Sequence, residues 1–173
     1  MTFELIDSQN AVFRVLGALE CQLTGNFLWV SEEIDEDGAS GVVFRAYDEV
    51  EDADPEYVGY VLFADVTGDP DEPDTTCLSA DNLAEVDELM RQEIAKQFNV
   101  LEWTDPQLNI GAQGTKMLMN SYKVLDEDVV YQKVSHRITL SARKWVMIIC
   151  FVPSRFLDFG RCAWSILDNV RFI

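Results

Sequence analysis

The feature that most constrains the fold is a pair of long alternating segments separated by three acidic residues. "TKMLMNSYKVL" (115–125) and "VVYQKVSHRITL" (129–140) alternate apolar and polar side chains, with "DED" between them. A period of two is typical of half-buried strands, and a short polar connection is typical of a hairpin. "RKWVMIICFV" (143–152) then stays apolar until Pro153, as in a central strand. We therefore predict three neighbouring antiparallel strands.

Two helices are predicted around this group. "SADNLAEVDELMRQEIAKQF" (79–98) has Ser79 as a candidate N-cap and apolar residues at helical spacing, and "RFLDFGRCAWSILDNV" (155–170) shows the same period. Shorter strands are predicted at 3–7, 11–16, 26–30, 41–47, 57–66 and 99–103, and "VRFI" closes the chain as a last strand. Strands, a helix, a meander and another helix indicate an α+β fold. We expect one antiparallel sheet with two main helices packed on it, in a single domain over residues 1–173.

The second half of the chain resembles the PsbP/DcrB-like fold family, which includes small bacterial chaperones for secreted effectors (the Eag type). The segments that carry the resemblance are "LAEVDELMRQEI", "IGAQGTKMLMNSYKV", "VVYQKVSHRITL", "KWVMIICFV" and "WSILDNVRFI", over roughly residues 79–173. The resemblance implies a PsbP-like sandwich. It also implies a role as chaperone or adaptor for an effector secreted by a type VI-like system.

The charge of the chain is strongly acidic and unevenly distributed. The net charge is −18, and residues 31–74 hold sixteen of the 31 acids with Arg45 as the one base, which gives −15 for that segment. Residues 101–173 hold seven acids and nine bases. An acidic surface repels nucleic acid and anionic membranes, so neither is an expected partner, and insertion into a membrane is not expected. A basic protein is the partner that such a charge favours.

Three acidic segments carry most of this charge: "SEEIDEDG" (31–38), "AYDEVEDADPEY" (46–57) and "TGDPDEPD" (67–74). Glycine and proline punctuate them, so we predict loops at strand ends that together form one acidic surface. Trp103 beside "TDP" is a candidate interface aromatic, whereas the other tryptophans are expected in the core. The predicted partner-binding residues are Asp35, Asp37, Asp48, Glu49, Glu51, Asp52, Asp54, Glu56 and Trp103.

Catalytic and metal motifs are incomplete throughout the sequence. "GAQGTK" (111–116) lacks the order of a phosphate-binding loop, and an EF-hand register with Gly38 at position six puts Phe44 where a bidentate glutamate is required. A looser cation site in the acidic loops stays open. His136 and Cys150 lack an orienting third group, so a structural histidine is expected. We predict neither a catalytic residue nor a cofactor, although a small enzyme without a recognisable motif remains an alternative.

Four cysteines are spaced too widely for a zinc site. The start "MTFELIDSQ" lacks the charged and apolar regions of a signal peptide, and the longest apolar stretch, Trp145–Val152, has eight residues. We therefore expect a cytoplasmic protein with reduced thiols. The function that these features favour is a non-catalytic module that captures a basic partner, as an immunity protein neutralises a bacterial toxin. The effector chaperone is the alternative.

Overall fold

A computed structural model describes residues 3–6, 11–17, 19–36, 39–67, 78–110, 116–141, 144–153 and 157–172. About half of the chain is in strands. The strands are β1 (Phe3–Ile6), β2 (Val12–Val15), β3 (Leu19–Gln22), β4 (Leu28–Glu36), β5 (Ala39–Asp48), β6 (Glu56–Thr67), β7 (Asn99–Trp103), β8 (Gln107–Ile110), β9 (Lys116–Asp126), β10 (Val129–Ser141), β11 (Lys144–Pro153) and β12 (Arg171–Phe172), and the helices are α1 (Leu83–Gln97) and α2 (Leu157–Asp168). Within these ranges no helix is long and apolar enough to cross a membrane.

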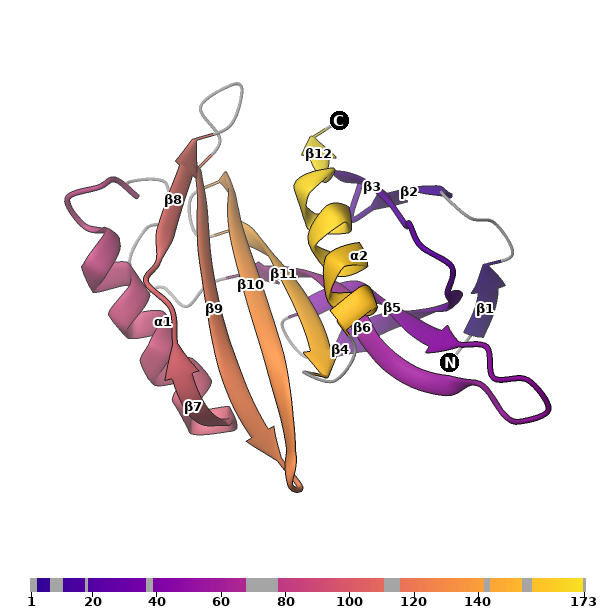
Figure 1. The fold of residues 1–173 in the computed structure, drawn as a ribbon. Coiled ribbons are helices and arrows are strands. Elements are labelled where there is room, and N and C mark those ends of the chain that lie inside the picture. The colour runs from indigo at the N-terminus through magenta and orange to yellow at the C-terminus, as the bar shows by residue number, and fades with distance from the viewer. Residues whose placement is uncertain are drawn as a thin grey trace.

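Nine of the described strands form one twisted antiparallel sheet (Figure 1). Its order is β1-β4-β5-β6-β11-β10-β9-β7, with β8 also paired to β9. The predicted neighbours β9, β10 and β11 are therefore confirmed. Glu127 and Asp128 connect β9 to β10, and both have positive φ, as a two-residue type I′ hairpin turn requires. The pairing of β6 with β11 joins the two halves of the chain across the intervening helix and meander.

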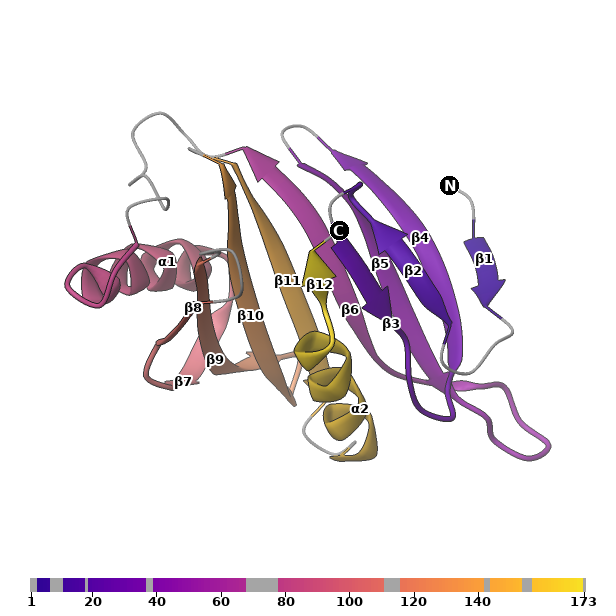
Figure 2. The same cartoon turned by 90° about the horizontal axis from the view of Figure 1, so that it is seen from above.

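A second, three-stranded sheet of order β12-β3-β2 lies with α2 over one face of the large sheet (Figure 2). The main core fills the space between them. It includes Leu19 of β3 and Leu23 just after it, Phe44 and Phe63 of the large sheet, and Phe159 of α2. Burial of each such side chain contributes about 1.5–3 kcal/mol. This core holds the β4–β6 half of the large sheet rigid.

Helix α1 covers the opposite face of the large sheet, at its other end. Val86 and Met90 of α1 pack against Leu118 of β9, whereas the preceding residue of that strand, Met117, packs against the main core. Successive side chains of a strand point to opposite faces, so the two helices lie on different sides of the sheet. The face under α1 is called face A below. Beyond the helix, face A continues across β10, β11, β6, β5 and β4.

The predicted fold class is wrong. We expected an α+β PsbP-like sandwich with a single antiparallel sheet and two main helices packed on it. The protein is mostly sheet, its helices are short, and β2, β3 and β12 form a separate sheet. The physical reason is that strands of two to four residues carry too few alternations for their partners to be inferred. β3 in particular was not predicted, and it provides the pairing that holds β2 and β12 together.

Two local predictions are also corrected. Ser79 does not cap α1: the helix begins at Leu83 with Asn82 as N-cap, and the Asn82 side chain instead accepts a hydrogen bond of 2.7 Å from the Ser79 backbone N–H. The first acidic segment is not a loop, because β4 continues through it to Glu36. Pairing with β5 satisfies the backbone there, so the acidic side chains need only reach solvent or a counter-ion.

Candidate functional site

The β5–β6 connection is an acidic hairpin that extends away from the body of the protein (Figure 1). Every residue from 48 to 57 is exposed, and no basic residue lies among them. The ends of the two strands bring Asp48 and Glu56 opposite one another, and Asp52 at the tip has φ of 60°. The term acidic hairpin is used below for these carboxylates: Asp48, Glu49, Glu51, Asp52, Asp54 and Glu56.

The predicted single acidic surface is divided by the structure. Asp35 is exposed near the end of β4, where it pairs with Ser40 at the start of β5, whereas the acidic hairpin begins at the other end of β5. Ten residues of extended strand span about 33 Å, so the two acidic groups are far apart. Asp37 and residues 68–74 lie outside the described residues. Six of the nine predicted binding residues therefore come together, and Asp35 does not join them.

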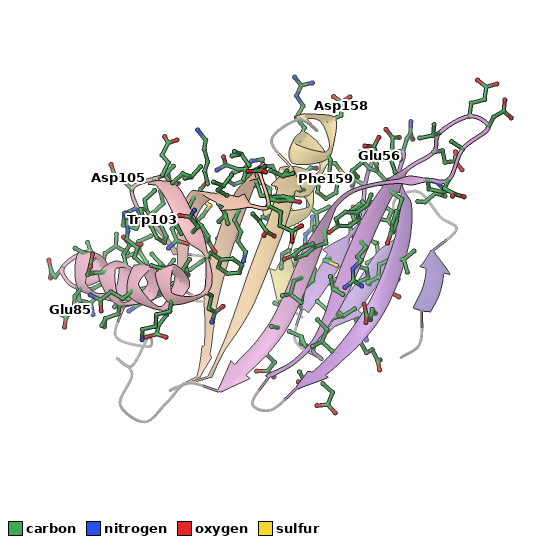
Figure 3. All side chains as sticks on the ribbon, turned by 90° about the horizontal axis from the view of Figure 1, so that it is seen from below. Glu56, Glu85, Trp103, Asp105, Asp158 and Phe159 are labelled. Atoms are coloured by element: carbon green, nitrogen blue, oxygen red, sulfur yellow. The ribbon has the colours of Figure 1, made fainter. Side chains whose placement is uncertain are left out.

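Trp103 lies far from the acidic hairpin, on β7 at the opposite edge of the sheet, as its position relative to Glu56 in Figure 3 shows. Its ring lies 5.0 Å from that of Tyr122, and the Arg91 guanidinium lies 5.1 Å from its centroid. These contacts hold the indole between α1 and the sheet. Trp103 therefore has a packing role, and the structure does not place it in one surface with the acidic residues.

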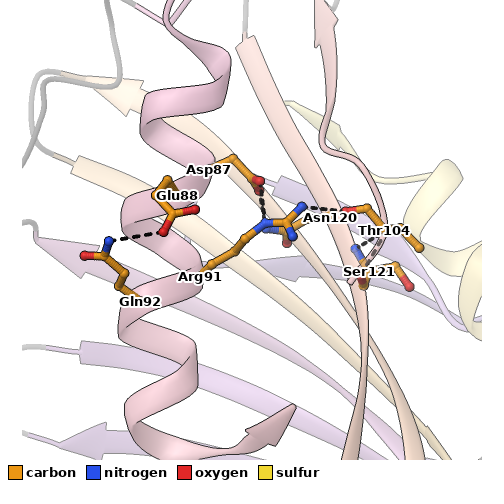
Figure 4. Close-up of polar contacts among 7 residues, drawn as sticks. All are labelled: Asp87, Glu88, Arg91, Gln92, Thr104, Asn120 and Ser121. Atoms are coloured by element: carbon orange, nitrogen blue, oxygen red, sulfur yellow. Dashed lines mark hydrogen bonds and ion pairs between the residues drawn. The ribbon is translucent and has the colours of Figure 1, made fainter. Parts of the chain in front are cut away.

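A buried polar network fastens α1 to the sheet beside Trp103 (Figure 4). The buried Asp87 carboxylate accepts hydrogen bonds from Arg91 Nε at 2.6 Å and from Asn120 Nδ2 at 3.2 Å. Arg91 Nη2 donates to the Thr104 carbonyl at 2.9 Å, and Thr104 Oγ1 donates to the Ser121 carbonyl at 2.9 Å. A buried carboxylate is stable only when it is paired and hydrogen-bonded in this way. The network anchors the helix.

Face A carries an aromatic row that the sequence pattern did not predict. Backbone pairing leads from Tyr122 of β9 to Lys133 of β10, then to position 151 of β11 and to Tyr60 of β6. Directly paired residues project from the same face, so Tyr60 lies on the face that α1 covers elsewhere. Lys133 is buried beneath the Phe98 ring, with Nζ 3.4 Å from its centroid, and burial lowers the pKa of this ammonium to about 7.

All five tyrosines of the chain lie on face A. Tyr131 is two positions from Lys133 on β10, and Tyr47 is two positions from Arg45, the partner of Tyr60. Tyr57 pairs with Tyr47, and their ring centroids are 5.5 Å apart at 59°. Burial raises the pKa of the Tyr57 phenol above its usual value, and the nearby phenols of Tyr60, Tyr47 and Tyr131 raise it further, whereas Arg45 opposes the change. Four of the five phenols thus converge over β5, β6 and β10.

The converging tyrosines border an open hollow of about 490 Å³ on face A. It is lined by Tyr47, Tyr57 and Tyr60 together with the aliphatic side chains of Ile34, Val43 and Leu62, and by Arg45. The name tyrosine hollow is used for it below. Tyr57 keeps 38% of its surface exposed. An aromatic side chain left this accessible on a rigid sheet is typical of an interface.

Arg45, the one basic residue among residues 31–74, is neutralised within the sheet. Its guanidinium donates to the carboxylate of Glu32, which is 8% exposed and lies diagonally across from it on β4. Arg45 therefore adds little net charge to the tyrosine hollow. The pair also explains why β4 tolerates an acidic residue on a buried position, since a buried carboxylate requires a counter-ion.

A second open hollow, of about 500 Å³, lies between the acidic hairpin and β4. Its lining consists of Leu28 of β4 and of hairpin residues, two of them charged: Glu49, Val50, Glu51, Ala53 and Pro55. Leu28 pairs directly with Tyr47, which lines the tyrosine hollow. The acidic hairpin therefore contributes carboxylates to a hollow that lies close to the tyrosine hollow, across the pairing of β4 with β5. The name acidic hollow is used for it below.

The remaining candidate residues are only partly described. His136 pairs with Ile148 and Cys150 with Val134 in the β10–β11 register, and their side chains lie outside the described residues, as does Cys77. Cys21 and Cys162 are buried and free, and burial raises the pKa of the Cys21 thiol to about 12. Trp29 is buried as expected, but Trp164, also expected in the core, is 38% exposed. In the described part of the chain, no three His, Cys, Asp or Glu side chains gather as a metal site requires.

The sequence did contain a signal for the tyrosine hollow. Val43, Arg45 and Tyr47 alternate along β5, and the acidic segment ends on Tyr57, so two tyrosines frame the acidic residues. Tyr57 and Tyr60 are three positions apart, however, and a regular strand would place them on opposite faces. The register shift between Ala46 and Tyr47 brings them to the same face. Gly59, which pairs with Ala46 at the shift, is the signal that could have indicated it, because a glycine inside a strand often marks a bulge.

Comparison of the chain with known protein families and with curated proteins found no match. The resemblance of residues 79–173 to the PsbP/DcrB-like family therefore stays a prediction that rests on hydrophobic patterns.

Proposed function

We propose that this protein is a non-catalytic binding module that captures a basic protein partner, and that its role is to neutralise a bacterial toxin as an immunity protein. The observation that carries the proposal is the acidic hairpin. Six carboxylates between positions 48 and 56 are exposed on a connection that extends beyond the sheet, with no basic residue among them. Like charges held this close repel one another, and a partner that brings Lys or Arg relieves the repulsion.

The position of the hairpin suits rapid capture of such a partner. A concentrated negative field steers a basic protein toward the surface, and association then exceeds the rate of neutral proteins at low ionic strength. Strands β5 and β6 lie on the main core, so the base of the hairpin is held rigidly. A rigid base reduces the conformational entropy that is lost on binding. Both properties favour tight, fast inhibition over transient contact.

The experiment uses the product of the neighbouring gene, or the protein that co-purifies from the native cell, as partner. Replacing Asp48, Glu49, Glu51 and Asp52 with Asn or Gln is expected to lower the association rate at least ten-fold in dilute salt, and much less at high salt. A matched control removes four exposed carboxylates elsewhere: Glu85, Glu88, Asp105 and Asp126. If the control variant loses as much, only net charge matters. If neither variant nor salt changes the rate, the proposal is refuted.

The second candidate function is a chaperone or adaptor for a secreted effector, and the tyrosine hollow favours it. A chaperone holds an apolar client segment on an exposed apolar face, and the hollow is lined mainly by aromatic and aliphatic side chains. Binding to such a client is expected to be insensitive to salt and to the four hairpin substitutions. The same kinetic measurements therefore distinguish the two functions.

A further inference from the structure

We infer that the tyrosine hollow and the acidic hollow form one two-part docking site for a basic, amphipathic segment of a protein partner. An apolar or aromatic side chain of that segment occupies the tyrosine hollow, and a Lys or Arg of the same segment meets the carboxylates of the acidic hollow. The inference rests on the proposed function, capture of a basic partner, and adds the chemistry of the segment that is recognised.

The two hollows lie close together because directly paired residues line them, although they have no lining residue in common. Leu28 lines the acidic hollow, Tyr47 lines the tyrosine hollow, and the two pair across β4 and β5. Tyr47 and Glu49 are two positions apart in the chain, and each lines one hollow. An extended segment rises about 3.3 Å per residue, so these two positions are about 7 Å apart. A single short segment is long enough to reach both hollows.

The tyrosine hollow suits an uncharged anchor. The Arg45 charge is neutralised by Glu32, so neither an anion nor a cation gains much there. The tilted pair of Tyr47 and Tyr57 and the aliphatic lining instead offer a large contact area, and tyrosine loses little side-chain entropy when it is immobilised. Aromatic residues in such hollows often carry most of the binding free energy. This part of the site is expected to control how long the partner stays bound.

The acidic hollow suits a cation. Glu49 and Glu51 are the two charged residues of its otherwise apolar lining, and the other acidic residues of the hairpin are exposed. Charge complementarity at an exposed rim acts mainly on the association rate, and a contact of this kind is screened by salt. The distance between the hollows then determines the spacing of the two anchoring residues in the sequence of the partner segment. It requires an apolar residue and a Lys or Arg two positions apart in a strand, or three to four positions apart on a helix.

The test does not require that the partner be identified first. Random peptides of about 12 residues, or about three turns of helix, are displayed and selected on the protein of residues 1–173 in dilute salt. The selected peptides are expected to share an apolar or aromatic residue with a Lys or Arg two to four positions away. Their dissociation rate is expected to rise about ten-fold or more in Tyr57→Ala, with the association rate unchanged. Replacing Glu49 and Glu51 with Gln should instead lower the association rate.

The outcomes separate this inference from the proposed function. Peptides that carry only basic residues, and that bind Tyr57→Ala as well as the original protein, overturn the two-part site and leave the acidic capture standing. Neutral apolar peptides that bind independently of salt overturn the proposed function and the inference together, and they favour the chaperone. Peptides that carry an apolar or aromatic residue and a Lys or Arg support the proposed function and the inference, provided that Tyr57→Ala raises their dissociation rate and the glutamate substitutions lower their association rate.

A second measurement avoids variants that fail to fold. With 3-fluorotyrosine in place of tyrosine, the protein has five fluorine-bearing rings, all on face A. A selected peptide is expected to shift the fluorine resonances of Tyr47, Tyr57 and Tyr60, which line the hollow, and to leave that of Tyr122, which is buried beneath α1. Equal shifts at all five rings, or none at the three lining rings, overturn the inference.

Discussion

Lys133 is a buried lysine whose replacement is expected to stabilise the protein. It is 2% exposed on face A, its Nζ lies 3.4 Å from the centroid of the Phe98 ring and 6.0 Å from that of Tyr122, and burial lowers its pKa from 10.5 to about 7. Methionine has a similar length and no charge to desolvate. We therefore predict that Lys133→Met raises the free energy of unfolding at neutral pH.

The size of the gain follows from the two pKa values. The difference between 10.5 and about 7, at about 1.36 kcal/mol for each pH unit, corresponds to a penalty of about 5 kcal/mol for holding the ammonium in the folded state near neutral pH. The contact with the Phe98 ring stabilises the cation by about 1–2 kcal/mol and is lost in the variant. Lys133 makes a further interaction that the variant also loses, so the expected net stabilisation by Lys133→Met is at most about 2–4 kcal/mol.

The pH dependence of stability provides a sharper assay than stability alone. Between pH 7 and the unfolded value of 10.5 the unfolded chain holds a proton on Lys133 that the folded protein lacks, so the free energy of unfolding rises with pH. Urea unfolding at several pH values from 7 to 9 should show a rise of about 1–3 kcal/mol for the original protein that is absent from Lys133→Met. Above pH 9 the Cys21 thiol, with a pKa raised by burial from 9.0 to about 12, adds a slope of the opposite sign.

The control is Lys123→Met on the neighbouring strand. The Lys123 side chain is 45% exposed and its Nζ lies 2.6 Å from the more exposed Glu102 carboxylate. An exposed pair contributes at most about 1 kcal/mol, so this variant should keep the slope of the original protein and change its stability little. If Lys133→Met destabilises the protein, or leaves the slope between pH 7 and pH 9 unchanged, the ammonium is not buried as a costly charge and the reasoning is refuted.

Two further predictions test the contacts that build the fold. Asp87→Ala removes the buried carboxylate that Arg91 Nε contacts at 2.6 Å, and urea unfolding is expected to show a free energy of unfolding lower by about 3–5 kcal/mol. The control Glu88→Ala, on the exposed side of α1, should change that free energy by less than about 1 kcal/mol. Equal losses in the two variants would contradict the anchoring role of Asp87. A Cβ added at Gly41 would lie 2.2 Å from the carbonyl oxygen of Phe63. Gly41→Ala should therefore force β5 and β6 apart and lower the midpoint of thermal unfolding by roughly 5 °C or more. An unchanged midpoint would show that the two strands separate freely.

Local patterns in the sequence were sufficient for the elements that depend on near neighbours. The β9–β10 hairpin and the adjacent β11 were predicted because alternating residues and a short acidic turn leave few other pairings. The apolar spacing of residues 79–98 predicted a helix with one apolar face, and Val86 and Met90 of that face are buried. It did not predict that Asp87 is buried too, because that depends on Asn120 from a strand more than thirty residues away.

What the sequence alone determined about the candidate site is its charge. Covalent proximity keeps the six carboxylates of the acidic hairpin together in any fold, so their clustering could be predicted. Tertiary structure decided everything that depends on register and distance. The length of β5 separates Asp35 from the hairpin, and a register shift brings Tyr57 and Tyr60 to one face. The face that a strand residue occupies changes when its pairing shifts by one position, and the chain between the paired strands does not specify that shift.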